Sequence, residues 1–192
     1  MVRQSVLAAA VAALVEGGVE RLTIDDVAAR SGVAKTTIYR HWASKAALAV
    51  DAVASEMRPL PTPDTGDPRA DLATWCEGVG SEPDQERLST LFLTVLEAAR
   101  RDPELSRLSE QLRDERQKPL RTVLELARLR GQIAPGTDVA MVVEVLAAAV
   151  FYRRLVLRRA VEAADALRIV DTVLPELRPP SMHRAAGSLA TA

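Results

Sequence analysis

Apolar residues near the N-terminus recur at helical spacing and are interrupted by residues that end helices. Between Val6 and Val15 they return every three or four residues, which indicates the buried face of an α-helix. Gly17-Gly18 is expected to end this helix, because glycine adopts the left-handed backbone of a C-terminal cap without steric cost. Three more helices are then expected: a second that stops at Ser31-Gly32, a third over about 34–41 and a fourth over about 44–57.

A proline-rich segment, residues 59–68, marks the clearest boundary in the chain, because its prolines and glycine prevent a continuous helix. Helical patterns fill most of the chain beyond this segment, and Pro119 is expected to kink or divide the longest of them. These patterns cover about 69–79, 85–101, 103 to near 131, 138–159 and 164–174. We therefore predict a first domain over 1–57, a second over 69–178 and a flexible tail over 179–192.

Composition supports an all-α fold of about nine helices. Apolar residues make up 48% of the chain and aromatic residues only 3%, while strong helix formers recur and alternating β-branched runs are scarce. The formal net charge of −1 argues against a protein that coats nucleic acid through bulk positive charge, but it permits a local basic patch.

The second and third expected helices have the arrangement of a helix-turn-helix. They are joined by Ser31-Gly32-Val33, where glycine permits a sharp turn. No acidic residue occurs between Val27 and Val50, and the cations there are Arg30, Lys35, Arg40 and Lys45. A surface that faces DNA phosphates needs cations, hydroxyls and amides, so this run favours DNA binding. A solvated helix face with chance charge segregation is the alternative.

The segment from Thr23 to Leu48 carries a specific order of residues. A threonine cap is followed by a Gly-Val turn, a Lys-x-Thr-hydrophobic-Tyr run, an aromatic residue and Ser-Lys-x-x-Leu. This order closely resembles the DNA-binding signature of the tetracycline-repressor (TetR) family, and the resemblance covers about the first 55 residues. Ala34, Trp42, Ala43 and Ala46 depart from the commoner residues of that signature. The resemblance implies a three-helix N-terminal DNA-binding domain and a C-terminal helical domain that binds a ligand and dimerises.

The resemblance also implies roles for the polar residues of this segment. The third expected helix would enter the major groove, where arginine suits guanine and threonine suits the thymine methyl group. Side chains at helix starts and at the end of the third expected helix would contact phosphates. The residues assigned to DNA are Thr23, Lys35, Thr36, Thr37, Tyr39, Arg40, His41 and Lys45. Trp42 is expected to anchor the core rather than stack on a base.

The apolar helix expected over 138–159 is the candidate dimerisation element. Its apolar residues, such as Val142, Leu146 and Phe151, cover more of the helix circumference than one core face needs. A helix fully buried within the monomer is the alternative. The resemblance favours a homodimer through the last two helices, since dimeric helix-turn-helix proteins bind palindromic operators.

A small-molecule effector inside the second domain is a further implication of the resemblance. The candidate wall residues are Trp75, Cys76, Phe92, Leu96, Leu112, Arg116, Met141, Val145 and Tyr152. Their apolar character suggests a hydrophobic or amphipathic ligand, with aromatic side chains favoured as pocket walls. Plain core packing is the alternative for each, and Arg116 could equally form a surface ion pair with Asp114 or Glu115.

Signals for catalysis, metal binding and cofactors are weak. The two histidines are His41 and His183, the single Cys76 is expected to be buried and inert, and no phosphate loop or metal-spaced cluster occurs. We therefore predict no enzyme, no metal and no cofactor. With no secretory signal at its start, the chain is expected to be cytoplasmic.

The predicted function is that of a transcriptional repressor released from DNA by a ligand. A ligand-binding or protein-interaction module with a vestigial helix-turn-helix is the rival of another class. A non-specific architectural DNA-binding protein is disfavoured by the net charge.

Overall fold

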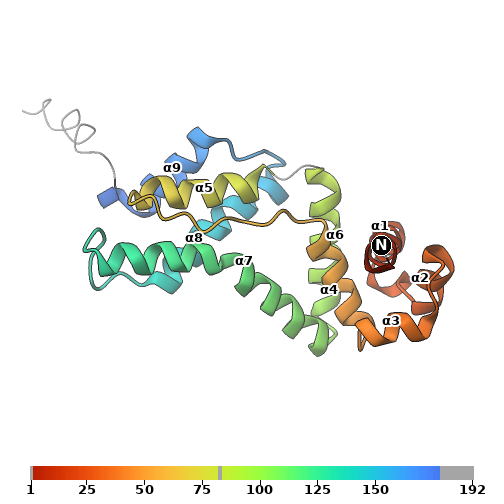
Figure 1. Cartoon of the computed structure of the whole chain (residues 1–192). Helices are drawn as coiled ribbons and strands as arrows, with labels where there is room; N and C mark the ends of the chain where they lie inside the picture. Colours follow the sequence, from red (N-terminus) through yellow and green to blue (C-terminus); the bar gives the residue numbers. More distant parts are fainter. Residues whose placement is uncertain (1, 82–83, 178–192) are drawn as a thin grey trace, which may run out of the picture. The chain divides into compact units, whose positions relative to one another are not determined.

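The computed structural model describes residues 2–81 and 84–177, and that part of the chain is all-helical (Figure 1). Its nine α-helices are α1 (Val2–Arg21), α2 (Ile24–Ser31), α3 (Lys35–His41), α4 (Lys45–Ser55), α5 (Pro68–Gly80), α6 (Gln85–Ala99), α7 (Pro103–Leu129), α8 (Val139–Phe151) and α9 (Ala163–Val173). A π-helical turn, Tyr152–Val156, follows α8, and a 3₁₀ turn, Pro175–Leu177, follows α9. The all-α prediction is confirmed. The tail predicted over 179–192 lies outside the described residues.

The helices form two compact units, each built from two stretches of sequence. The first unit lies within Met1–Pro59 and Glu82–Arg116, and the second within Leu60–Ser81 and Gln117–Ala192. The helix α7 contributes its first half to one unit and its second half to the other. Its backbone stays helical through Pro119, where the sequence predicts a kink or division, and Pro119 lies in the second unit.

The first unit is organised around α1, which packs against α2, α4 and α6 (Figure 1). Fully buried residues from several helices meet in its core, among them Val6, Leu14, Leu22, Ile38 and Leu48. The regular helix of α1 is interrupted at Gly17-Gly18, as expected. Gly18 has φ 74°, a conformation that favours glycine, and one more helical turn leads to Arg21.

The core of the first unit extends beyond the predicted DNA-binding domain. Leu91 and Val95 from α6 and Leu105 from α7 are buried in the same apolar cluster as α1 to α4. The helix α1 is long and apolar enough to span a membrane by length and composition. Its inward face, including Val11 and Leu14, is instead buried in this core.

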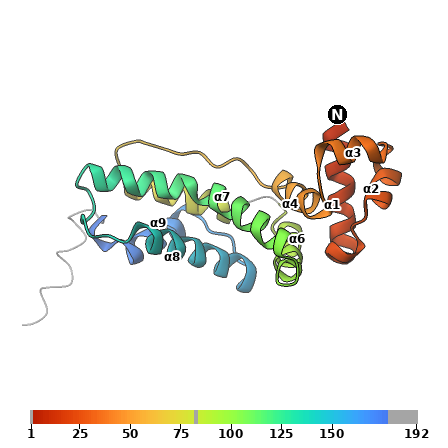
Figure 2. The ribbon, with the colours of Figure 1, turned by 90° about the horizontal axis from the view of Figure 1, so that it is seen from below.

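The second unit packs α5, α8 and α9 with the second half of α7, and Figure 2 shows α8 and α9 side by side. Trp75, Leu124 and Leu146 are buried in its core. Arg69 on α5 donates from Nε and Nη2 to the Oδ1 and Oδ2 atoms of Asp171 on α9, at 2.6 and 2.9 Å. These hydrogen bonds raise the pKa of Arg69 and tie the two helices together.

The C-terminal end of α8 differs from the sequence expectation. The apolar pattern predicts a helix to about Arg159, but α8 ends at Phe151 and passes into the π-helical turn. Arg158 then has a positive φ of 52°, and the chain continues without regular structure until α9. The break lets Val161 fold back, so that its amide donates to the Gly80 carbonyl at 3.2 Å.

Candidate nucleic-acid interface

The turn between α2 and α3 has the geometry of a helix-turn-helix. Thr23 caps α2 by accepting a hydrogen bond on its hydroxyl from the Asp26 amide at 3.1 Å. Gly32 ends α2 with φ 68°, and its amide donates to the Ala28 carbonyl at 3.0 Å. This left-handed residue turns the chain into α3, which starts without a side-chain cap at Ala34.

The helix α3 is held by one face and presents the other to solvent. Ile38 is fully buried, and Trp42, which comes directly after the helix, is buried as well. On the outer face, Lys35, Thr36, Tyr39, Arg40 and His41 are exposed, and Thr37 is half-buried. The predicted DNA-facing residues of α3 thus share one helix and reach solvent together.

Trp42 is an anchor in the core, as predicted. Its indole Nε1 donates to Asp51 Oδ2 on α4 at 2.8 Å, and the same oxygen accepts from Arg3 Nη2 at 2.7 Å. The Arg3 guanidinium lies 6.0 Å from the centre of the tryptophan ring, within cation–π range. These contacts connect the end of α3 to α4 and to the start of α1.

Several cations of the acid-free segment have partners within the first unit. Arg30 pairs with Glu16 through two hydrogen bonds of 2.6 and 2.8 Å and with Asp26 at 2.8 Å. The hydrogen bonds from Arg30 lower the pKa of Glu16, and the two carboxylates raise the pKa of Arg30. Arg30 therefore joins α1 to α2.

The remaining cations differ in their partners. Lys35 Nζ lies 2.6 Å from Asp25 Oδ1, and Lys45 Nζ donates to the Val19 carbonyl at 3.1 Å. Arg40 has no ion-pair partner among the described residues and projects from the outer face of α3. At the start of α4, Ser44 caps the Ala47 amide and also donates to Glu104 on α7.

The predicted ligand-contact residues fall in both units. In the first unit, Phe92 and Leu112 are half-buried, Leu96 is exposed, and Arg116 donates to the Arg58 carbonyl. In the second unit, Trp75 is buried, whereas the three residues on α8 and the π-turn are exposed on the surface: Met141, Val145 and Tyr152. Their role in ligand binding stays a prediction.

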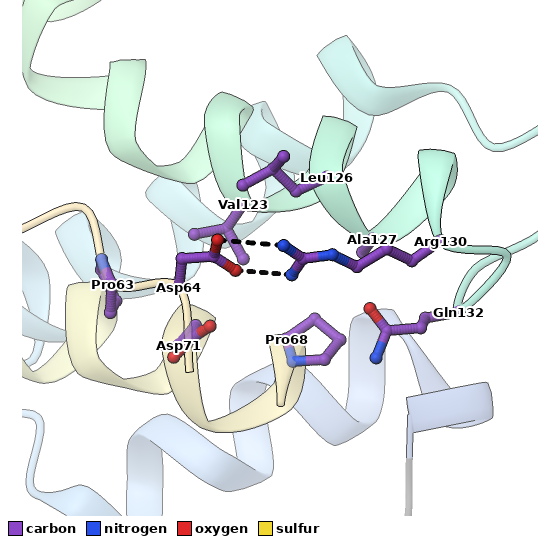
Figure 3. Close-up of a pocket in the computed structure, with 9 residues that line it drawn as sticks. All are labelled: Pro63, Asp64, Pro68, Asp71, Val123, Leu126, Ala127, Arg130 and Gln132. Carbon is purple, nitrogen blue, oxygen red and sulfur yellow. Dashed lines mark hydrogen bonds and ion pairs between the residues drawn. The ribbon is translucent and has the colours of Figure 1, made fainter. Parts of the chain in front are cut away.

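A small hollow in the second unit is lined by other residues (Figure 3). It measures about 180 Å³ and has no enclosed space for a water molecule. Figure 3 shows Arg130 crossing it to pair with Asp64 through both Nη atoms of the guanidinium. This pairing lowers the pKa of the Asp64 carboxyl. Gln132 and Asp71 flank the pair and bind backbone atoms of Gly66 and Thr65. These contacts fasten the proline-rich segment to α5 and to the residues after α7 within the second unit.

Cys76 is buried, as expected. Burial raises the pKa of its thiol to about 12, so the reactive thiolate is suppressed at neutral pH.

Two family models match the chain and together span most of it. The model described as "Bacterial regulatory proteins, tetR family" matches residues 6–52, and "Tetracyclin repressor-like, C-terminal domain" matches residues 62–173. The chain belongs to the TetR family. The resemblance found in Thr23–Leu48 is therefore confirmed, and this TetR-family chain is a DNA-binding transcriptional regulator.

Relatives of this TetR-family chain cover most of its length. An uncharacterized HTH-type transcriptional regulator of Mycobacterium tuberculosis is 30% identical over 182 residues, which are 94% of this chain and 88% of the relative. A "DNA-binding transcriptional repressor TetR" of Mycobacteroides abscessus is 33% identical over 174 residues, or 88% and 90% of the two chains. These relatives are regulators of transcription rather than enzymes.

Solved structures share the fold. The TetR family transcription regulator SCO0332 matches with a TM-score of 0.64 and 35% identity, covering 93% of this chain and 99% of that one. The regulator FadR from Bacillus subtilis, solved with stearoyl-CoA, matches with a TM-score of 0.67 over 91% and 96% of the two chains. At 18% identity, the second match shows the shared fold alone.

The helices α1 to α4 form the reading head of this TetR-family chain, and the acidic partners within it are not predicted from the sequence. From the sequence alone, Asp25 and Asp26 are explained by capping and the helix dipole, and Glu16 and Asp51 have no evident role. The spacing of Asp26 and Arg30 on one helix is a visible signal for their pair, since side chains four residues apart are neighbours. The pairs of Arg30 with Glu16 and of Trp42 with Asp51 join different helices and leave no comparable signal.

Proposed function

We propose that this TetR-family protein is a repressor that binds a palindromic operator as a homodimer and leaves it when a small hydrophobic ligand binds. The outer face of α3 is the observation that carries the proposal. Its apolar side is fixed by buried Ile38 and Trp42, while Lys35, Tyr39 and Arg40 are exposed. A helix anchored in this way can present its cations and hydroxyls to a major groove.

Within this proposal, each residue has a part suited to its chemistry. Arg40 reads guanine, because no described carboxylate holds its guanidinium. Lys35, Thr36 and Thr37 contact the groove or its rim. The phosphate contacts are assigned to Thr23, Tyr39, His41 and Lys45, which are all exposed.

The exposed face of α8 supports the homodimer. Met141 and Val145 on α8 and Tyr152 and Val156 on the π-helical turn recur at intervals that place them on one side, and they are 42–62% exposed. A row of large apolar side chains left in water is typical of a surface that a partner covers. We propose that a second copy covers it, together with α9. Met141, Val145 and Tyr152 then serve dimerisation more directly than ligand contact.

The effector is proposed to be hydrophobic or amphipathic. Phe92 and Leu112 are half-buried in the first unit and Trp75 is buried in the second, and each keeps the apolar character expected of a ligand contact. The fold neighbour FadR holds stearoyl-CoA, a molecule with a long apolar chain. An operator-binding regulator acts where the chromosome is, and we propose a cytoplasmic location on this ground.

Selection of bound duplexes from random DNA at two salt concentrations tests the proposed function. We expect recovery of a palindrome, with affinity that falls steeply as salt rises because phosphate contacts release counterions. A variant with Arg40→Ala and Lys35→Gln serves as the control and should recover no palindrome. Weak, sequence-independent retention by the wild type contradicts the proposal and favours an interaction module with a vestigial reading head.

A further inference from the structure

Lys35, which the proposed function assigns to DNA, forms an ion pair with Asp25. Lys35 is the first residue of α3, and Asp25 lies in the first turn of α2. Their charged atoms are 2.6 Å apart, and their side chains are 54% and 75% exposed. A carboxylate near the N-terminus of a helix is favourable on its own. That preference does not explain why this one reaches across the turn to a lysine of the reading helix.

The neighbouring pair of Arg30 shows what a purely structural ion pair looks like in the same unit. Arg30 is held by Glu16 and Asp26 together, and its side chain is 33% exposed. It joins two helices, and both carboxylates contact its guanidinium at the same time. Lys35 has one carboxylate partner among the described residues, and both ends of that pair lie in water, so its ammonium can exchange partners at small cost.

We infer that Asp25 competes with DNA phosphate for the ammonium group of Lys35 and thereby limits the affinity of the reading head. The inference rests on the proposed contact of Lys35 with DNA. In the free protein the carboxylate occupies the ammonium at hydrogen-bonding distance. A phosphate oxygen must displace it, so part of the attraction between Lys35 and DNA is spent in breaking the pair.

Removal of the Asp25 charge has a defined consequence for sequence-independent binding. An exposed ion pair contributes at most a modest stabilisation, so Asp25→Asn should tighten binding to non-operator DNA by roughly 1.5- to 5-fold. A lysine that becomes available to one more phosphate should also steepen the dependence of log K on log salt by up to about 0.9.

The test is a fluorescence-anisotropy titration of a mixed-sequence duplex with the full chain, from about 50 to 200 mM salt. Asp26→Asn is the matched control, because it removes the same charge from the next position and leaves the Lys35 pair intact. It also removes one partner of Arg30, which Glu16 still holds. Asp25→Ser repeats the test with a different neutral side chain. Lys35→Gln and the double variant Asp25→Asn/Lys35→Gln complete a cycle that isolates the effect acting through Lys35.

The competition is supported if both Asp25 variants bind DNA more tightly than Asp26→Asn does and if this gain vanishes in the Lys35→Gln background. Equal gains in affinity from Asp25→Asn and Asp26→Asn overturn it, since the loss of one negative charge near the DNA then explains both. Weaker binding by Asp25→Asn also overturns it and makes Asp25 a residue that orients Lys35. If Lys35→Gln alone leaves binding unchanged, the proposed DNA contact of Lys35 fails together with the inference. A loss of binding by Lys35→Gln with no effect of Asp25→Asn rejects the competition alone.

Discussion

At Gly80, the structure predicts that substitution by alanine lowers the stability of the protein. Helix propensity alone predicts that the same substitution raises it. Gly80 is the last residue of α5, and alanine is a better helix former than glycine by about 1 kcal/mol in a helix interior. A Cβ atom added there lies 2.2 Å from the Cβ of Val161, 2.7 Å from its Cγ2 and 3.1 Å from its Cα. Ordinary contacts between carbon atoms are about 3.5–4.0 Å, so the new methyl group overlaps a fully buried residue.

The overlap cannot be relieved by rotating a side chain. The Cβ and Cα of Val161 move only with its backbone, whose amide also donates to the Gly80 carbonyl at 3.2 Å. Overpacking of this kind costs about 1–3 kcal/mol, and the propensity gain at a helix end offsets little of it. We expect Gly80→Ala to lower the free energy of unfolding of the second unit by about 1–3 kcal/mol.

Urea unfolding followed by the fluorescence of Trp75 measures this loss. A Trp42→Phe background removes the other tryptophan, which belongs to the first unit. Gly78→Ala, on the same helix, is the matched control, because its Cβ meets only the flexible end of Leu60 at 3.1 Å. With an m-value of about 1–3 kcal/mol per molar urea, the two midpoints should differ visibly. If Gly80→Ala raises the midpoint as much as Gly78→Ala does, the packing argument is wrong.

Four further results are expected. Arg40→Ala should weaken binding to the selected operator by about 1–3 kcal/mol in a titration and leave the unfolding midpoint unchanged; full affinity contradicts its assignment to DNA. Val145→Asp places a charge on the exposed apolar face of α8 and should convert dimers into monomers in sedimentation equilibrium, whereas an unweakened dimer rules out this face. The Cys76 thiol, with its pKa raised to about 12 by burial, should resist alkylation at about pH 8 until the chain unfolds, and fast labelling of folded protein refutes its burial. Arg30 lowers the pKa of Glu16, so their pair stabilises the first unit fully above the ordinary pKa of 4.5. This stabilisation is lost as pH falls through the lowered pKa of the folded state. Glu16→Gln should therefore flatten the dependence of the urea midpoint on acid pH, and an unchanged slope contradicts this.

The local geometry of the reading head could be predicted from sequence because its signals are local. Thr23 and Gly32 act on backbone atoms within a few residues, so a cap and a left-handed turn can be inferred from residue type alone. The burial of Ile38 and Trp42 can be inferred from helical spacing combined with the apolar character of the two side chains.

Other features depend on partners that are distant in sequence. The apolar face of α6 is visible in the sequence, but its spacing does not say that Leu91 and Val95 pack against α1. The apolar residues of α8 are equally visible, yet only the fold places Met141 and Val145 at the surface. Asp25 lies outside the acid-free run and is explained by the helix dipole, so the charge pattern gives no indication of its reach to Lys35.

The two-stretch construction of the first unit bears on the engineering of hybrid regulators. A graft that exchanges only the residues before the proline-rich segment would place a foreign α1 against the resident α6, whose Leu91 and Val95 pack in one core with the original α1. Mismatched side chains at this interface between α1 and α6 leave cavities or overlaps that destabilise the graft. A transplant of the reading head should therefore include residues 82–116, or the interface between α1 and α6 should be redesigned together with it.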